Sequence, residues 1–254
     1  MDDQTEYIDT LIALHRGLDR QGPGDIDFAR QLLRSLPPLP PQPRIADLGC
    51  GSGAGALLLA EHYQSSVLAV DASAVFIEEL QTRARAAGLE QWITAIVADM
   101  GQLGWPPGSI DLLWSEGAAY NLGFEQALSR WRPLLAEGGV AVVSELSWFT
   151  DAIPATVWGY WQAAYAGIGS EADNRQRAKR AGYRVVATSR LPSQAWWTNY
   201  YGPLRSRLNQ LNSDISSVAQ TVVQETEAEM ALFQQFSDIY GYTFYILSPE
   251  VEHR

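Results

Sequence analysis

Short runs of apolar residues alternate with longer segments of helical periodicity through the middle of the chain. The apolar runs are 44–48, 67–70, 93–98, 110–114 and 140–146, and the helical segments between them are 54–62, 73–87 and 124–136. Alternation of this kind is typical of a parallel sheet whose right-handed crossovers place helices on both faces. We therefore predict an α/β protein with a doubly wound, mostly parallel sheet.

Two further helical patterns precede this region, at 7–18 and 26–36, and the turn residues Gln21-Gly22-Pro23-Gly24 join them. A proline-rich stretch at 37–43 follows, where helix is excluded and strand pairing is poor. We predict that residues 1–43 form N-terminal helices and a stiff linker, and that they cover the binding site of the region that follows.

Aromatic residues become frequent after Leu146, and two more predicted strands lie at 183–187 and 243–247. The segment 204–236 between these strands has the pattern of one or two amphipathic helices. We predict a cofactor-binding α/β core at 44–150, followed at 151–254 by an aromatic-rich helical cap and the final strands of the sheet. The aromatic side chains are expected to be mostly core, with two or three lining a pocket.

The segment Asp47-Leu48-Gly49-Cys50-Gly51-Ser52-Gly53 follows the first predicted strand and opens the first crossover helix. Glycines let the backbone approach a ligand closely, and a helix N-terminus offers free N–H groups to an anionic one. Asp71 and Asp99 end the second and third predicted strands. Ligands of open parallel sheets bind beyond the carboxyl ends of the strands, so these three carboxylates are expected to converge on one crevice.

Each carboxylate suits a different part of a nucleoside ligand. Asp71 can accept both hydroxyls of a ribose, Asp99 can accept an exocyclic amine beside the apolar face of Met100, and Asp47 suits an ammonium or a sulfonium. The structural alternative is that Asp71 and Asp99 cap the helices that follow them. Three acidic residues at successive strand ends around a glycine turn favour the binding site.

The same turn also fits a nicotinamide dinucleotide fingerprint. Gly51, Gly53 and Ala56 match its glycine pattern, and Asp71 follows Gly51 by about 20 residues. That pattern does not require Asp47 before the turn or Asp99 on the third strand. An NAD(P)-dependent oxidoreductase and a non-catalytic cofactor-binding protein remain the alternatives.

The amino-acid composition limits the kinds of molecule that the protein is expected to bind. The 254 residues carry 18 basic and 29 acidic side chains, a net charge of −11, which argues against a binder of nucleic-acid backbone. The single Cys50 excludes an internal disulfide and a multi-cysteine metal site, and we predict no metal. No long apolar run indicates a signal peptide or membrane span, so the expectation is a cytoplasmic protein with a small-molecule substrate. The C-terminal amphipathic helices suit a homodimer contact or a buried cap equally well.

The chain resembles the class I S-adenosylmethionine-dependent methyltransferases from about Arg44 to Leu146. The segment 47–53 matches the glycine-rich first motif of that family, Asp71 its ribose-binding position, and Asp99-Met100 its adenine-contacting position; 131–139 resembles the approach to its fifth strand. The segments 111–124 and 195–201 are similar to a bacterial subgroup of small-molecule type. The resemblance implies a Rossmann-like, seven-stranded sheet with an antiparallel last strand, a helical insert before that strand, and methyl transfer from S-adenosyl-L-methionine by in-line displacement.

The expected cofactor-binding residues lie at the predicted strand ends and in the Gly-Pro-Gly turn. They are Asp47, Gly49, Cys50, Gly51, Gly53, Asp71, Ala72, Asp99, Met100, Ser115, Gln21 and Gly22. A general base is needed only when the acceptor loses a proton. The candidate catalytic residues are Glu116 just past the fourth predicted strand, Tyr120 close behind it, and His15 in the N-terminal segment.

Overall fold

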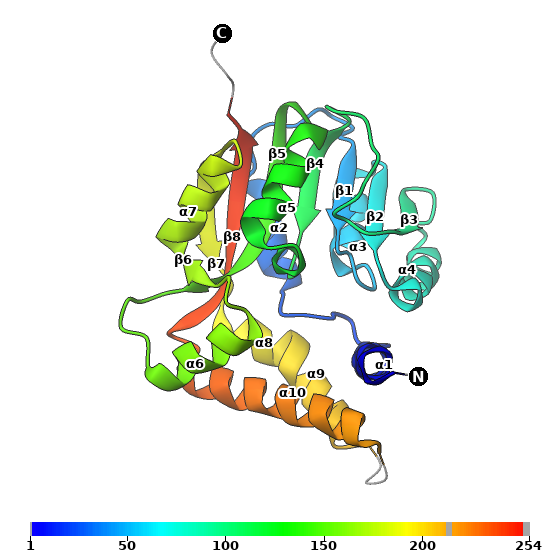
Figure 1. Cartoon of the computed structure of the whole chain (residues 1–254). Coiled ribbons are helices and arrows are strands. Elements are labelled where there is room, and N and C mark those ends of the chain that lie inside the picture. Colours follow the sequence, from blue (N-terminus) through cyan, green and yellow to red (C-terminus); the bar gives the residue numbers. More distant parts are fainter. Residues whose placement is uncertain (1, 212–214, 251–254) are drawn as a thin grey trace.

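The computed structural model describes residues 2–211 and 215–250, and its centre is a single sheet (Figure 1). The strand order is β3-β2-β1-β4-β5-β8-β7, with the short β6 paired to β5 outside this path. The strands are β1 Ile45–Leu48, β2 Val67–Asp71, β3 Ile93–Val97, β4 Ile110–Ser115, β5 Leu135–Trp148, β6 Gly169–Ser170, β7 Tyr183–Arg190 and β8 Tyr240–Pro249. Among the described strands, only β8 runs antiparallel to its neighbours β5 and β7, which confirms the predicted doubly wound sheet with an antiparallel last strand. The short β6 adds an eighth strand to the seven that were expected.

Helices cover both faces of this sheet and bury its central strands. Every residue of β1 and β4 is buried, as near-continuous apolar strands between two helical layers should be. Core residues of α2 Ile26–Arg34, α3 Ala54–Tyr63 and α4 Ala74–Ala87 pack on one face, and those of α5 Phe124–Trp131 and α7 Glu171–Arg180 on the other. The result is one core on each side of the sheet.

The region around β5 differs from the prediction. The helix expected over 124–136 ends at Trp131, a short 3-10 turn covers Arg132–Leu134, and β5 begins at Leu135 rather than Val140. The pairing of β4 with β5 shifts register between Ile110 and Leu112, so 136–139 form a bulge in which Gly138 has φ +73°. The two glycines that we expected to end a helix therefore lie inside a strand.

A second layer of helices lies beyond the carboxyl ends of the parallel strands (Figure 1). It comprises α1 Asp3–His15, α6 Ala155–Ala164, α8 Ser193–Trp196, the π-helix η3 Trp197–Tyr201, α9 Gly202–Leu208 and α10 Ser217–Phe236. The last four lie between β7 and β8, so the predicted helical insert is present and contains two helices in 204–236. α1 packs against α9 and α10 although it comes from the other end of the chain.

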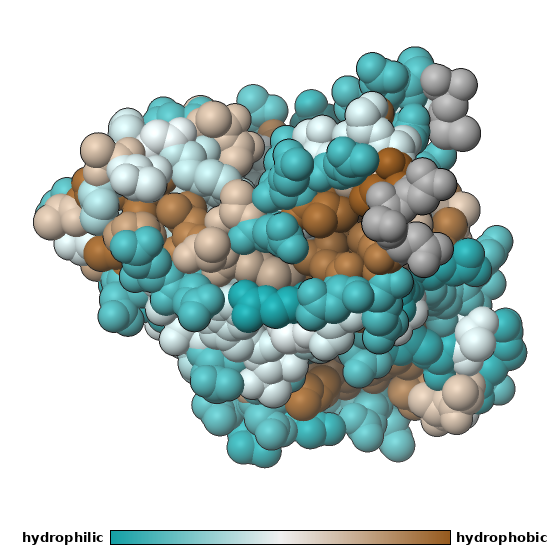
Figure 2. Space-filling model, turned by 90° about the horizontal axis from the view of Figure 1, so that it is seen from below, coloured by the Kyte–Doolittle hydropathy of each residue, from teal (hydrophilic) through white to brown (hydrophobic). Residues whose placement is uncertain are grey.

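The outer face of this helical layer is mainly polar, with strips of apolar side chains between the polar ones (Figure 2). None of the helices in the described ranges combines the length and apolar character that a membrane span requires.

Candidate active site

A cavity of about 460 Å³ lies between the carboxyl ends of the parallel strands and the N-terminal segment. Twelve of the residues expected to form the site line it: Asp47, Gly49, Cys50, Gly51, Asp71, Ala72, Asp99, Met100, Glu116, Tyr120, Gln21 and Gly22. Gly53, Ser115 and His15 do not line it. We call this space the first cavity.

The glycine turn forms the floor of the first cavity. Gly49, Gly51 and Gly53 have φ values of +74°, +53° and +92°, which other residues rarely adopt. A Cβ on Gly49 would collide with Ala118, and one on Gly51 would collide with Gln21. Gly53 is the N-cap of α3 and faces Leu80, so it shapes the turn without reaching the cavity.

Asp47 is a buried acid with an unmatched oxygen. Its side chain is only 2% exposed, and Oδ2 has no hydrogen-bond partner among the described residues. Burial, together with the charges of Glu116 and Asp71, raises the pKa of Asp47 to about 8. A buried acceptor without a partner at a cavity wall suits a cationic ligand.

Glu116 is held in an ion pair. Its Oε2 lies 3.1 Å from Nη1 of Arg20, and both side chains are about one-tenth exposed, at 10% and 11%. The other carboxylate oxygen, Oε1, has no partner among the described residues. Arg20 also lines the first cavity, and we did not predict it; its only signal in the sequence is that it precedes the Gly-Pro-Gly turn.

Asp71 and Asp99 bind the backbone of the turns that follow them as well as facing the first cavity. Asp71 accepts hydrogen bonds from the amides of Gly51 at 2.8 Å and Ser73 at 2.9 Å. Asp99 accepts from the amide of Gly101 at 2.7 Å and from Nε2 of Gln102 at 2.9 Å. A carboxylate oxygen can accept a second hydrogen bond, so a role in shaping these turns and a role in ligand binding are compatible.

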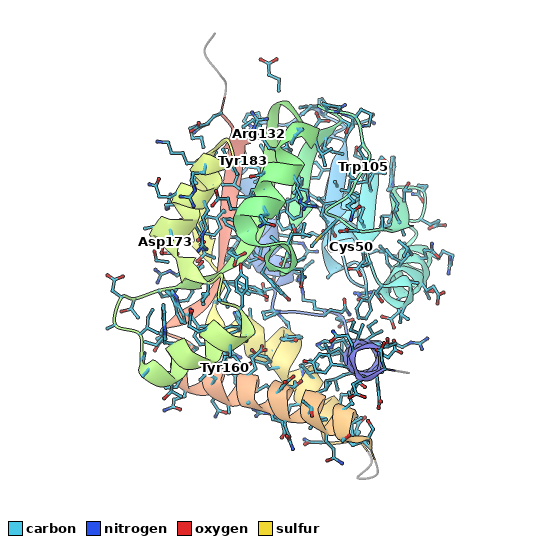
Figure 3. The ribbon with its side chains drawn as sticks, viewed as in Figure 1. Cys50, Trp105, Arg132, Tyr160, Asp173 and Tyr183 are labelled. Atoms are coloured by element: carbon cyan, nitrogen blue, oxygen red, sulfur yellow. The ribbon has the colours of Figure 1, made fainter. Side chains whose placement is uncertain are left out.

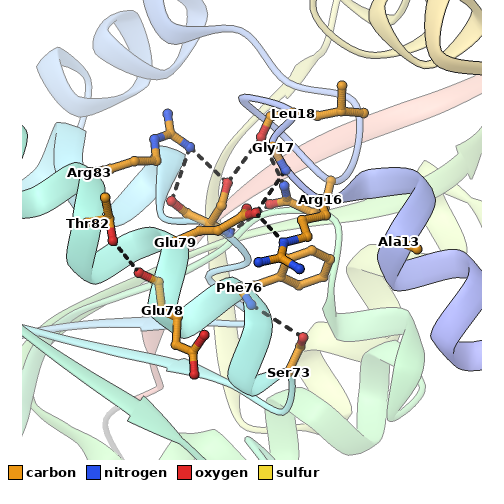
Figure 4. A network of polar contacts seen from close by, with 12 residues as sticks. Ala13, Arg16, Gly17, Leu18, Ser73, Phe76, Glu78, Glu79, Thr82 and Arg83 are labelled. Carbon is orange, nitrogen blue, oxygen red and sulfur yellow. Dashed lines mark hydrogen bonds and ion pairs between the residues drawn. The ribbon is translucent and has the colours of Figure 1, made fainter.

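The segment 16–24 is attached to the glycine turn and to α4 (Figure 4). Oε1 of Gln21 accepts from the amide of Ser52 at 2.8 Å, which places Gln21 against the turn. Nη1 of Arg83 donates to Oγ of Ser52 at 2.8 Å and to the carbonyl of Asp19 at 3.0 Å, and the amide of Gly17 donates to Glu79 at 2.9 Å. These contacts hold the N-terminal segment over the first cavity.

Two other predicted residues lie elsewhere. Ser115 is fully buried, and its hydroxyl donates to the carbonyl of Leu48 at 2.8 Å, linking β4 to β1. His15 donates from Nδ1 to the carbonyl of Leu11 at 2.8 Å, so its Nε2 accepts from the hydroxyl of Tyr200 at 3.0 Å. Burial lowers the pKa of His15, which favours the neutral ring.

A second cavity of about 390 Å³ adjoins the first, and residues Gln21–Pro23 and Tyr120–Asn121 line both. Its remaining walls are Leu146, Trp161, Ala164, Tyr165, Trp196, Tyr200, Glu229 and Tyr242. Figure 3 shows the relation of the two layers, with Cys50 at the end of β1 and Tyr160 on α6 below it.

The second cavity contains several residues that the sequence did not identify. Two or three aromatic residues after Leu146 were expected to line a pocket, and Trp161, Tyr165, Trp196, Tyr200 and Tyr242 line this one. Glu229 was not predicted, because an acid on an amphipathic helix is expected to face solvent. Its inward position depends on how α10 packs beneath the sheet.

Comparison with known proteins agrees with this geometry. Residues 45–139 match the methyltransferase domain family. A dimethylglycine N-methyltransferase of Parasynechococcus marenigrum (strain WH8102) is 34% identical over 115 residues, which span 45% of this chain and 41% of that relative. The matched segment is therefore less than half of the relative's length.

Solved structures show the same fold over nearly the whole chain. A methyltransferase from Geobacter sulfurreducens in complex with S-adenosyl-L-homocysteine has a TM-score of 0.78 at 18% identity, covering 95% of this chain and 98% of its own. The [4+2]-cyclase SpnF has a TM-score of 0.77 at 18% identity, covering 98% and 97%. Residues 45–139 therefore match a methyltransferase domain, and nearly the whole chain has the fold of an S-adenosylmethionine-dependent methyltransferase of known structure.

Proposed function

We propose that the protein transfers a methyl group from S-adenosyl-L-methionine to a small-molecule acceptor. The observation that carries the proposal is the unpartnered carboxylate of Asp47, buried beside a glycine turn in a cavity that adjoins a second one. A sulfonium or ammonium group would neutralise this carboxylate. The dimethylglycine N-methyltransferase relative supports a small-molecule acceptor, and the Geobacter structure with bound S-adenosyl-L-homocysteine supports the cofactor.

The residues of the first cavity suit the parts of this cofactor. We assign Asp71 to the ribose hydroxyls, and Asp99 with Met100 to the adenine. Asp47 and Glu116 suit the ammonium of the methionine end, and Arg20 suits its carboxylate. Gly49, Cys50, Gly51, Ala72, Gln21 and Gly22 complete the wall, while Gly53 and Ser115 shape the turn and the strand pair behind it.

When bound, S-adenosyl-L-methionine supplies an electrophilic methyl group: the acceptor's lone pair bonds to the methyl carbon as the S–CH3 bond breaks, and the released electron pair stays on sulfur. The protein's task is to align the acceptor and exclude water, and alignment alone is worth about 7–11 kcal/mol. Tyr120 lines both cavities, so we assign it to orienting the acceptor at their junction.

The two other catalytic candidates receive narrower assignments. Glu116 is already paired with Arg20, so we assign it to the cofactor side instead of proton transfer. His15 does not line either cavity, but its Nε2 accepts from the hydroxyl of Tyr200, which lines the second one. His15 is therefore proposed as a positioning residue for Tyr200.

Calorimetry tests the cofactor assignment. S-adenosyl-L-homocysteine is expected to bind the wild type, and Asp71→Ala is expected to weaken binding at least tenfold, because two hydroxyls lose their charged acceptor. Glu78→Ala, an exposed acid on α4, is the matched control and should leave the affinity unchanged. No heat with wild-type protein at high concentration would contradict the proposal.

The alternatives make different predictions in the same experiments. An NAD(P)-dependent oxidoreductase would bind NAD or NADP in place of S-adenosyl-L-homocysteine. A non-catalytic protein would bind the cofactor and methylate nothing in a broad metabolite screen. A homodimer also stays a prediction, which light scattering of the full chain would test.

A further inference from the structure

The second cavity has walls of fixed aromatic rings. The ring of Trp196 stacks on Phe233 with centroids 4.2 Å apart and lies 4.9 Å from Tyr242. Tyr165 lies 5.8 Å from Tyr120 in a tilted pair. Because each of these rings packs against another ring, the faces that line the cavity are held in place before any ligand arrives.

The rings surround one acid. Glu229 on α10 lines the second cavity, and its Oε1 accepts a hydrogen bond from the hydroxyl of Tyr201 at 2.6 Å. Burial raises the pKa of Glu229, so its charge is not well solvated. Burial raises the pKa of the two wall tyrosines Tyr200 and Tyr242, and the Glu229 charge contributes in the same direction, as expected for an acid that lines the same cavity.

A second acid lies behind the wall. Glu145 of β5 is fully buried, neither of its carboxylate oxygens has a hydrogen-bond partner among the described residues, and burial raises its pKa to about 8. Its charge contributes to raising the pKa of Tyr165, which lines the cavity. Glu229 of α10 therefore lines the cavity itself, and Glu145 of β5 is a buried acid close to one of its wall residues, Tyr165.

Among the described residues, no basic side chain forms an ion pair with either of these two acids, Glu229 and Glu145. In the same part of the chain, the arginines that lie over aromatic rings do so at Tyr183, Phe149 and Trp197, outside the second cavity. Arg177 is near enough to lower the pKa of Glu145, but it donates to the carbonyl of Gly167 and to Asn174.

We propose that the second cavity binds the methyl acceptor through a positively charged ammonium group, held among the rings of Trp161, Tyr200 and Tyr242 and beside Glu229. The acceptor is then a small organic cation whose ammonium group anchors it, and the methyl group goes to another of its atoms that keeps a lone pair, because a cationic nitrogen has none. Its role as acceptor rests on the proposed methyltransferase function, whereas the cation site itself rests only on the cavity. Aromatic faces and a carboxylate attract such a group, while an anion would be repelled and a neutral molecule would leave Glu229 unmatched.

Tetramethylammonium chloride is a suitable probe because it carries the charge and cannot be methylated. We would titrate it into the 254-residue protein at constant ionic strength and follow tryptophan fluorescence, since Trp161 and Trp196 line the cavity. Tert-butanol is the neutral control of similar size, and pivalate is the anionic one. The expected result is saturable binding of tetramethylammonium, at least tenfold tighter than binding of either control.

Substitutions identify the groups responsible. Glu229→Gln should weaken tetramethylammonium binding about tenfold, which corresponds to about 1.4 kcal/mol. Glu227→Gln, an exposed acid on the same helix, should leave it unchanged. Tyr200→Phe keeps the ring and should bind nearly as well as the wild type, whereas Tyr200→Leu should bind several-fold more weakly. Circular dichroism of each variant verifies folding.

Equal binding of tetramethylammonium and tert-butanol, or an unchanged affinity in folded Glu229→Gln, would overturn the cation site. A titration with S-adenosyl-L-homocysteine on the same samples separates the two proposals. If S-adenosyl-L-homocysteine binds and tetramethylammonium does not, the proposal of a cationic acceptor is overturned and the proposed methyltransferase function stands. If only tetramethylammonium binds, the cation site is supported and the proposed function is overturned.

Discussion

Asp47 links the acidity of one buried side chain to the stability of the fold. Its pKa rises from 3.8 to about 8 on burial, so the folded protein binds more protons than the unfolded chain between these values. The free energy of unfolding without ligand therefore falls as the pH rises through this range. Glu145, whose pKa burial also raises to about 8, contributes in the same direction.

We expect Asp47→Asn, which cannot ionise, to be more stable than the ligand-free wild type at pH 8. The gain should be a few degrees in melting temperature, because about 1 kcal/mol corresponds to about 2–4 °C in a chain of this size. At pH 4.5 the difference should be much smaller, since Asp47 is then mostly neutral in the folded protein and the pH is close to the unfolded pKa of 3.8. Thermal unfolding at both values tests this, with the exposed Asp151→Asn as control.

The same variant should bind S-adenosyl-L-homocysteine about tenfold more weakly, because a charge-assisted contact to the ligand is worth about 1.5–3 kcal/mol. Gain of stability together with loss of binding is the combination expected of a residue kept for its ligand. A variant that is less stable at pH 8 and binds normally would show that Asp47 has a structural role instead.

Individual residues could be predicted from the sequence where their position depends on neighbours along the chain. Asp47, Asp71 and Asp99 each follow a strand by local pattern, and the topology of a parallel sheet then brings them together. Arg20 and Glu229 reach the cavities only through contacts between distant segments. No local pattern distinguishes them from the solvated charges beside them.

At the scale of the element, the turn between β1 and α3 depends on glycine for two separate reasons. Gly53 and Gly88 both have positive φ, at +92° and +67°, but a Cβ on Gly53 would meet Leu80 while one on Gly88 would meet nothing within 4 Å. Gly88→Ala should therefore lose about the 1–2 kcal/mol of the left-handed conformation alone. Gly53→Ala should lose clearly more in urea unfolding; equal losses would show that the Leu80 contact adjusts freely.

The segment 16–24 should depend on the ion pair between Arg20 and Glu116. Removing one partner leaves the other buried and unpaired, so Arg20→Gln and Glu116→Gln should each destabilise the protein, and the sum of their two losses should exceed the loss in the double variant. The double variant should recover part of the loss, with a coupling energy of about 0.5–3 kcal/mol. Urea unfolding of all four proteins measures it, and strict additivity would mean that the pair does not hold the segment.

Most elements were predictable because apolar periodicity and end signals agree. The helix predicted at 73–87 is α4, with Ser73 as its N-cap and Gly88 as its left-handed C-cap. The start of β5 was not predictable, because a Gly-Gly pair such as Gly138-Gly139 occurs both at the end of a helix and inside a β-bulge. Pairing with β4 decides between them, and that pairing is long-range.

For the molecule as a whole, ligand binding should appear as thermal stabilisation. A ligand at 100 times its dissociation constant adds about 2.7 kcal/mol, which corresponds to about 5–10 °C here. We expect S-adenosyl-L-homocysteine to raise the melting temperature by this amount in the wild type and much less in Asp71→Ala. NAD at the same concentration is the control, and an equal rise with NAD would favour the oxidoreductase alternative.

The overall architecture followed from the sequence because alternating strands and helices leave few topologies open. The packing of the helices beyond the strand ends could not be predicted from the sequence. α1 comes from the start of the chain and α10 from near its end, and they meet beneath the same cavities. The packing of α1 against α10 therefore determines which side chains line these cavities.

The single sulfhydryl of this chain belongs to Cys50, in the wall of the first cavity. It is 8% exposed, and burial raises the pKa of its thiol, so a thiol reagent should modify the folded protein slowly. Any reagent that reaches it must occupy the space that we propose for the nucleoside. The amount of Cys50 that reacts in a wild-type sample would therefore report the fraction of protein molecules whose first cavity holds no ligand. No label has to be introduced for this measurement.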